Sequence, residues 1–236
     1  MTGVIQGCTF PREEALDTFL PQYSDHPLGM EGMYREVRRL ADEIPPDHLF
    51  LEVGTRMGGS AIAWMHAITR SKHPSRWLWT CDPYGDKKYM GWDNLAYNEE
   101  KYRAAMQVLA CEASMHEARW YHWRMTSKDF LALWQDGRMT WFADRVATQR
   151  PRFGFVYLDG DHLPDVVLEE VRLVWPWLHP QGVIVVDDET FFDSANSRNP
   201  ENAKLIPVLR KTGEVKENRV WLTKAAIGAA RDLVRG

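Results

Sequence analysis

The chain has 236 residues, of which 44% are hydrophobic, and a formal net charge of −4. This length favours one domain with a sizeable core, and the mild charge without a basic stripe argues against a nucleic-acid partner. No apolar run reaches about 18 residues, so no membrane-spanning helix is expected. The N-terminus lacks the apolar region of a signal peptide, and Cys8, Cys81 and Cys111 have no metal or disulfide spacing. These features predict a cytoplasmic protein.

Helical patterns dominate the start of the chain. Residues 11–20 could form a short helix that begins at Pro11, and residues 30–44 have the apolar spacing of an amphipathic helix that ends at Pro45-Pro46. We expect residues 1–46 to form an N-terminal helical segment that serves as a lid or an oligomerisation contact. Residues 47–236 would then form the main domain.

The segment HLFLEVGTRMGGS at residues 48–60 combines a strand, a glycine-rich turn and a helix start. Residues 49–53 are apolar enough for a buried strand, and Ser60 opens a helical stretch over residues 61–69. Glycines in such a turn let the backbone approach a nucleotide-like ligand, which the new helix meets with free N–H groups. The spacing matches neither the phosphate-binding loop nor the G-x-G-x-x-G pattern. The alternative is a tight turn without a ligand.

A second strand is predicted over residues 76–81, followed by Asp82-Pro83. A carboxylate at this strand end could accept hydrogen bonds from both ribose hydroxyls of an adenosyl ligand, although a solvated Asp82 is the alternative. Residues 84–98 have the composition and length of a lid or binding loop. A helix over residues 99–115 and a strand over 119–123 follow.

The next helix begins near Thr126 and Ser127, one of which caps it. A fourth strand over residues 153–158 leads to a helix over 164–175. A turn at Pro180-Gln181-Gly182 is then expected to lead into a strand over 183–186.

Beyond that strand, residues 205–210 could be helix or strand, and Val215 and residues 220–223 form closing strands before a tail helix from Ala225. The alternation of strands and helices predicts an α/β fold with a doubly wound, mostly parallel sheet and helices on both faces.

Two of the predicted strands end in acidic residues. Asp159 follows the strand over 153–158, and Asp187 and Asp188 follow the strand over 183–186. Ligand sites of such sheets lie at the carboxyl ends of the strands, and three carboxylates there need a cation or a proton. Mg²⁺ suits oxygen ligands, with Ca²⁺ or Mn²⁺ as alternatives. His162 is a candidate general base. The alternative is that the acids cap helices and that His162 only packs.

The combination of LEVGTRMGGSA, WTCDPY, YLDGDH and PQGVIVVDDE resembles the metal-dependent class I O-methyltransferases that use S-adenosylmethionine (SAM). The similarity extends over residues 30–190 and is greatest to the branch that tailors sugars of macrolide and aminocoumarin antibiotics; catechol methyltransferases are more distant. It implies a Rossmann-like seven-stranded sheet whose closing strands are antiparallel. It also implies a Mg²⁺ site at Asp159, Asp187 and Asp188, with His162 as the base and Asp159 as a further catalytic residue.

The same resemblance implies a SAM site around the glycine-rich turn, with Asp82 on the ribose and Ser127 near the adenine. The residues expected to bind SAM are Glu52, Gly54, Thr55, Gly58, Ser60, Asp82, Ser127 and Asp159. The acceptor would be a small-molecule hydroxyl of a sugar or phenol, with Trp92, Tyr97 and Trp123 as candidate walls.

Two other functions remain open from the sequence. A metal-independent N- or C-methyltransferase would share the SAM residues without needing the carboxylate cluster. A non-catalytic SAM-binding module would keep only the fold. A nicotinamide-dependent oxidoreductase is disfavoured by the glycine spacing.

Overall fold

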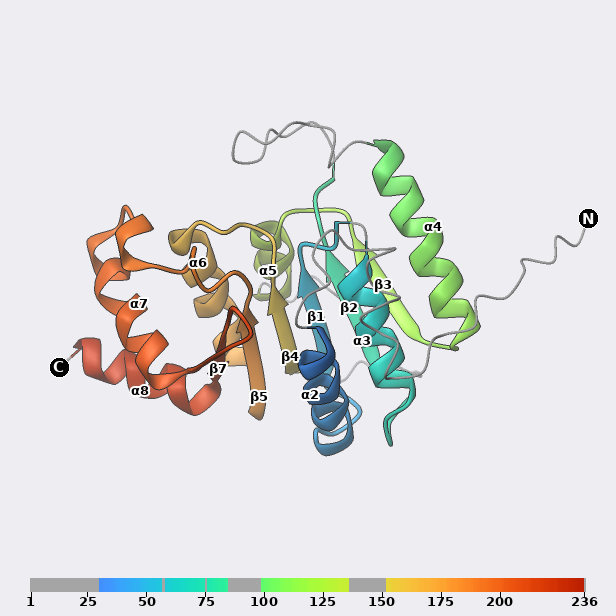
Figure 1. Cartoon of the computed structure of the whole chain (residues 1–236), viewed down its shortest axis with the longest axis horizontal. Helices are drawn as coiled ribbons and strands as arrows, with labels where there is room; N and C mark the ends of the chain where they lie inside the picture. Colours follow the sequence, from blue (N-terminus) through green and yellow to red (C-terminus); the bar gives the residue numbers. More distant parts are fainter. Residues whose placement is uncertain (1–29, 57, 75, 85–98, 136–151, 236) are drawn as a thin grey trace, which may run out of the picture.

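A seven-stranded sheet forms the centre of the chain, in the strand order β3-β2-β1-β4-β5-β7-β6 (Figure 1). The computed structural model describes residues 30–56, 58–74, 76–84, 99–135 and 152–235. The strands are β1 (Leu49–Val53), β2 (Trp77–Cys81), β3 (Arg119–Trp123), β4 (Phe153–Leu158), β5 (Leu178–Val186), β6 (Glu214–Lys216) and β7 (Arg219–Thr223).

The α-helices of these ranges are α2 (Met30–Glu43), α3 (Gly59–Thr69), α4 (Glu99–Met115), α5 (Ser127–Gln135), α6 (Pro164–Val174), α7 (Pro200–Thr212) and α8 (Lys224–Arg235). Short 3₁₀ turns lie at Trp175–Trp177 and Ser194–Asn196.

Strands β1 to β5 pair in parallel, whereas β7 pairs antiparallel to both β5 and β6. The strand order reverses between β1 and β4, because the chain runs outward to β3 before it returns to β4 on the other side of β1. In open parallel sheets, the carboxyl ends of the strands at such a reversal line the ligand crevice. The predicted doubly wound seven-stranded sheet is therefore confirmed, including its antiparallel closing strands.

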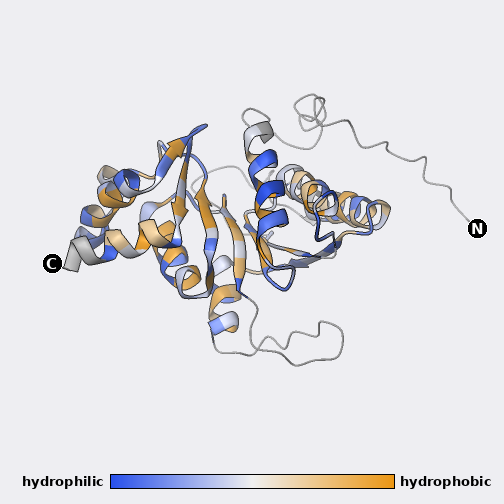
Figure 2. Cartoon of the chain, turned by 90° about the horizontal axis from the view of Figure 1, so that it is seen from below, coloured by the Kyte–Doolittle hydropathy of each residue, from blue (hydrophilic) through white to orange (hydrophobic). Residues whose placement is uncertain are grey.

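Two apolar cores pack against the sheet, and many of the residues along its strands are hydrophobic (Figure 2). Leu49, Leu51 and Val53 of β1 belong to the core shared with α5 to α8, whereas Phe50 belongs to the core shared with α2 and α3. A strand buried on both faces needs apolar residues in succession, which explains the almost unbroken apolar run of β1.

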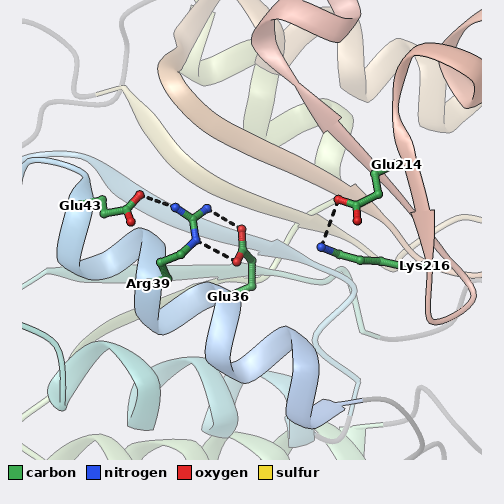
Figure 3. Close-up of polar contacts among 5 residues, drawn as sticks. All are labelled: Glu36, Arg39, Glu43, Glu214 and Lys216. Atoms are coloured by element: carbon green, nitrogen blue, oxygen red, sulfur yellow. Dashed lines mark hydrogen bonds and ion pairs between the residues drawn. The ribbon is translucent and has the colours of Figure 1, made fainter.

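Helix α2 is part of the second core. Met33, Val37 and Leu40 are fully buried and recur at three- and four-residue steps. On its exposed side, Arg39 lies between Glu36 and Glu43, near the β6–β7 hairpin with its Glu214–Lys216 pair (Figure 3). A lid or oligomerisation role for residues 1–46 stays a prediction.

The structure corrects one expectation and decides another. Residues Pro180, Gln181 and Gly182 lie within β5 and not in a turn before it, since β5 begins at Leu178. The pairing with β4 is irregular over this stretch, where Pro180 and Gln181 are exposed. The segment at residues 205–210 is helical, as part of α7. The expected helix at 11–20 and nearly all of the expected loop at 84–98 fall outside the described residues. Within the described ranges, no helix has the length and apolarity to cross a bilayer.

Gly54 is required where β1 meets β4. Its φ of +88° lies in the left-handed region, and an added Cβ would lie 2.0 Å from the carbonyl oxygen of Asp159. Gly228 in α8 offers a contrast, because the nearest atom to an added Cβ there is 4.0 Å away, on Trp175.

We predict that Gly54→Ala lowers the free energy of unfolding by more than about 2 kcal/mol, through strain and backbone displacement. Gly228→Ala is the matched control and should leave stability unchanged or raise it by up to about 1 kcal/mol, because alanine is the better helix former. Urea denaturation of both variants measures the difference. Equal stabilities would show that the β1–β4 junction tolerates a side chain.

Candidate active site

The glycine-rich turn lies between the ends of three neighbouring strands. The Gly54 N–H donates to the carbonyl of Cys81 at the end of β2, at 2.9 Å. The Asp159 N–H, just after β4, donates to the carbonyl of Val53, also at 2.9 Å. Gly58 has φ +85° and precedes α3 without any side-chain cap. The first N–H groups of α3 are therefore presented at the crevice, where they favour an anionic ligand group.

Asp82 holds this turn in place. Its carboxylate accepts hydrogen bonds from the N–H groups of Arg56 and Tyr84, each at 3.0 Å, and the residue is 1% exposed. Burial raises the pKa of Asp82, and the backbone hydrogen bonds partly oppose this rise. A carboxylate has about four lone-pair sites, so capacity remains for a ribose hydroxyl. The predicted ribose contact stays a prediction.

Glu52 is fully buried beneath the turn. Burial raises the pKa of Glu52 to about 8; the neighbouring side chains of Ser60 and Trp64 oppose this rise and the nearby Asp82 adds to it. Glu52 is therefore mostly protonated at neutral pH in the ligand-free protein. Glu52, Thr55, Gly58 and Ser60 thus belong to one β1–α3 unit, as the sequence predicts, and their contacts with SAM stay predictions.

Asp159 and Asp187 are brought together at the ends of β4 and β5. Burial raises the pKa of Asp159 well above its usual value, and the charge of Asp187 and a hydrogen bond with Asp187 add to this. The neighbouring positions follow from the parallel pairing of β4 with β5, in which Leu158 faces Val186. The predicted meeting of these two carboxylates is therefore observed.

A cationic residue that sequence reasoning missed lies against this pair. Nε of Arg219, at the start of β7, is 2.7 Å from Oδ1 of Asp187. Arg219 also hydrogen-bonds Tyr157 of β4, and its side chain is only 7% exposed. The antiparallel pairing of Val186 with Val220 places Arg219 beside Asp187. That pairing has no local sequence signal.

Asp188 is turned toward His162. The backbone of Asp188 is left-handed, with φ +53°. One carboxylate oxygen accepts a hydrogen bond from the side-chain amide of Asn218 at 3.2 Å, and the other lies 3.7 Å from Nδ1 of His162. The ring of Phe191, which is 45% exposed, lies 5.5 Å from the ring of His162. His162 therefore has an acidic partner on one side and an exposed aromatic ring on another.

The three acids supply the hard oxygen donors that a divalent cation prefers. Asp188 adds to the repulsion on Asp159, so all three charges lie within mutual reach. However, no three His, Cys, Asp or Glu side chains in the described part of the chain are already arranged around a common metal position. The donor chemistry fits a metal, and its assembly would require Asp187 and Asp188 to reorient.

At the start of α5, the structure separates two candidates. Thr126 caps the helix, since its hydroxyl accepts from the N–H of Asp129 at 3.2 Å. Ser127 lies beside the buried Glu170 of α6, whose pKa burial raises to about 8. An adenine contact by Ser127 stays a prediction.

Trp123 packs between the rings of Trp79 and Phe130 and is partly buried in the core on that face. Its backbone carbonyl accepts a hydrogen bond from the N–H of Asp82 at 3.2 Å, and its role as an acceptor wall stays a prediction. The other two proposed walls, Trp92 and Tyr97, lie outside the described residues.

The fold and this site define a class I methyltransferase. Residues 51–189, more than half of the chain, match the family described as a methyltransferase domain, and the chain belongs to this family. It is a SAM-dependent methyltransferase, as the motifs predict. A search of curated proteins finds no match.

Several solved structures share the fold. An O-methyltransferase from Bacillus cereus, solved with SAH, is 13% identical, with a TM-score of 0.53 over 90% of this chain and 92% of that one. The calicheamicin methyltransferase CalS11 is 16% identical, with a TM-score of 0.53 over 90% and 85% of the two chains. MycE of the mycinamycin pathway, solved with Mg, SAH and mycinamycin VI, is 15% identical, with a TM-score of 0.52 over 90% of this chain and 54% of that one.

We predict that SAM binding releases up to about one proton at pH 7, because a cationic ligand beside Glu52 favours its carboxylate form. Calorimetric titration in two buffers of different ionisation enthalpy measures the release. Glu52→Gln, which cannot ionise, should lose most of the buffer dependence. Identical enthalpies in both buffers for the unaltered chain would contradict the prediction.

Proposed function

We propose that this protein transfers the methyl group of SAM to a hydroxyl of a small molecule, with a divalent cation held by Asp159, Asp187 and Asp188. The observation that carries the proposal is the His162–Asp188 pair, which stands beside the Asp159–Asp187 pair at the carboxyl ends of β4 and β5. A base and a set of oxygen ligands in one crevice suit deprotonation of a hydroxyl.

His162 is the proposed general base. Its Nδ1 faces Asp188, so Nε2 is the nitrogen that can accept the proton of the acceptor hydroxyl. One oxygen of Asp188 faces the ring and would stabilise the imidazolium that forms, while its other oxygen, which now accepts from Asn218, would turn to the cation. A bound divalent cation would lower the pKa of the acceptor hydroxyl.

The methyl transfer itself is a displacement at carbon. The acceptor oxygen forms a bond to the methyl carbon while the bond from that carbon to the sulfonium sulfur breaks, and the electron pair stays on sulfur. The hydroxyl proton goes to His162. The turn at Gly54 and the N-terminus of α3 would fix the donor, so the main contribution of the protein is alignment of the two reactants.

The acceptor class follows from the surroundings of His162. Phe191 and Leu163 are large apolar side chains that are 45% and 39% exposed, and both flank His162, Phe191 in space and Leu163 in sequence. An exposed aromatic ring beside a base suits the apolar face of a sugar or a phenol ring. The structures of CalS11 and of MycE with Mg and mycinamycin VI support a tailoring reaction of this kind.

The leading alternative is a metal-independent N- or C-methyltransferase, which the Arg219–Asp187 ion pair favours because it supplies a counter-charge without a metal. A cytoplasmic location and a homo-oligomeric state remain predictions from the sequence.

We predict that His162→Gln lowers kcat by about 10²–10⁴-fold, the usual contribution of a general base. SAM affinity should stay within error of the unaltered chain, because His162 does not contact the glycine-rich turn. His179→Gln is the matched control, since His179 is a partly exposed histidine near the start of β5, at the opposite edge of the sheet. Unchanged turnover in His162→Gln across a panel of sugar and phenol acceptors would exclude His162 as the base.

For Phe191→Ala we expect a roughly three- to tenfold rise in the acceptor KM with little change in SAM affinity, from the loss of ring stacking. Tyr121→Ala is the control, because Tyr121 is an equally exposed aromatic residue on β3, at 49%. Steady-state kinetics with varied acceptor separates the two constants. An equal KM for both variants would remove Phe191 from the acceptor site.

A further inference from the structure

The β6–β7 hairpin is docked onto the acidic segment that follows β5. Its two turn residues, Glu217 and Asn218, both have positive φ, 52° and 58°, as the two-residue hairpin turn with matching twist requires. The carbonyl of Asn218 accepts a hydrogen bond from the N–H of Glu189 at 2.7 Å, and its side-chain amide donates to Asp188 at 3.2 Å. These two hydrogen bonds hold the turn against the segment that contains Asp187 and Asp188, two of the proposed metal ligands.

Arg219 follows this turn and is held on several sides. Its Nε lies 2.7 Å from Oδ1 of Asp187, and its Nη1 donates to the carbonyl of Glu217 at 2.9 Å. The side chain is 7% exposed and that of Asp187 is 16% exposed, so water screens this pair weakly. An ion pair this close and this buried fixes the orientation of Asp187.

The guanidinium therefore engages the carboxylate that a divalent cation would need. An arginine cannot lose its proton in a protein, so its charge cannot be removed to admit a second cation. A metal ion bound by Asp159 and Asp187 would be repelled by a guanidinium at hydrogen-bond distance from Asp187. Either the arginine withdraws from Asp187 or the metal binds weakly.

We infer that Arg219 is the resident counter-cation of the Asp159–Asp187 pair and competes with the divalent cation for Asp187. Metal loading is then coupled to the release of Arg219 from that carboxylate. The inference rests on the proposed metal site, and it assigns to Arg219 a positioning role rather than contact with the reactants. In the metal-free protein, Arg219 keeps the buried carboxylates compensated.

A purely structural role gives the opposite expectation. If Arg219 only anchored the hairpin to β5, its removal would loosen Asp187 and Asp188 and would weaken metal binding. If Arg219 competes with the metal, its removal strengthens metal binding. The sign of the change in metal affinity therefore separates the two roles.

The test is a titration of the SAM-free protein with Mn²⁺, followed by electron paramagnetic resonance of the free ion. We expect Arg219→Gln to bind Mn²⁺ at least about tenfold more tightly than the unaltered chain, a typical size for coupling between two bound cations. Arg219→Lys keeps the positive charge and should stay close to the unaltered affinity. Arg210→Gln is the matched control. Arg210 pairs with Glu189, which follows Asp188 in sequence but is not one of the three proposed metal ligands.

SAM affinity of each variant shows that the sheet is intact. Equal or weaker Mn²⁺ binding by a SAM-competent Arg219→Gln overturns the inference while leaving the metal site in place, provided that Asp159→Asn abolishes the binding. No Mn²⁺ binding by any of these proteins overturns both the inference and the metal part of the proposed function.

A second measurement uses the unaltered chain, so it does not depend on whether Arg219→Gln folds. The Nε–H resonance of Arg219, assigned by its disappearance in Arg219→Lys, should move when Mg²⁺ is added, because the ion pair with Asp187 breaks. A resonance that stays in place at saturating Mg²⁺ overturns the inference.

Discussion

Buried carboxylates at the ends of adjacent parallel strands are the constraint on which this site depends. Glu52, Asp159 and Asp187 lie on β1 or just after β4 and β5, on the face of the sheet that α2 and α3 cover. Like charges in a buried crevice are costly unless they are protonated or compensated. The protein uses both solutions, because Glu52 stays mostly neutral and Asp187 pairs with Arg219. The rest of the site is arranged around this compensation.

Under the proposed function, the methyl donor would bind at the β1 side of the crevice and the acceptor at the β5 side. On the β1 side, the glycine-rich turn, Asp82 and the uncapped start of α3 present backbone N–H groups and a carboxylate that suit a donor with a carboxylate and a ribose. On the β5 side, Asp188 and His162 form a pair whose outer edge is open to solvent and to Phe191. Asp159 lies between the two sides, and the charge of Asp187 acts on it.

Supporting structure explains why the acidic segment after β5 keeps its shape. The tight β6–β7 turn supplies Asn218 to Asp188 and to the backbone of Glu189, and α7 supplies Arg210 to the side chain of Glu189. With Arg219 on Asp187, each of the consecutive acids Asp187, Asp188 and Glu189 has a partner from a later part of the chain. The closing antiparallel strands, which carry no proposed ligand-binding residue, position the acids that do.

Local patterns in the sequence predicted most of the elements and most of the acidic residues at the strand ends. The strands at 49–53, 119–123 and 153–158 and the helix at 99–115 have the predicted bounds, because apolar periodicity and glycine or proline breaks are local signals. The sequence also placed Asp159 and Asp187 together, since parallel strands end at one edge. Three contacts could be found only in the folded structure. Arg219 pairs with Asp187, Asp188 faces His162, and Phe191 lies beside that histidine. These contacts come from antiparallel pairing and from a left-handed backbone at Asp188, and neither leaves a periodic pattern in the residues that it joins.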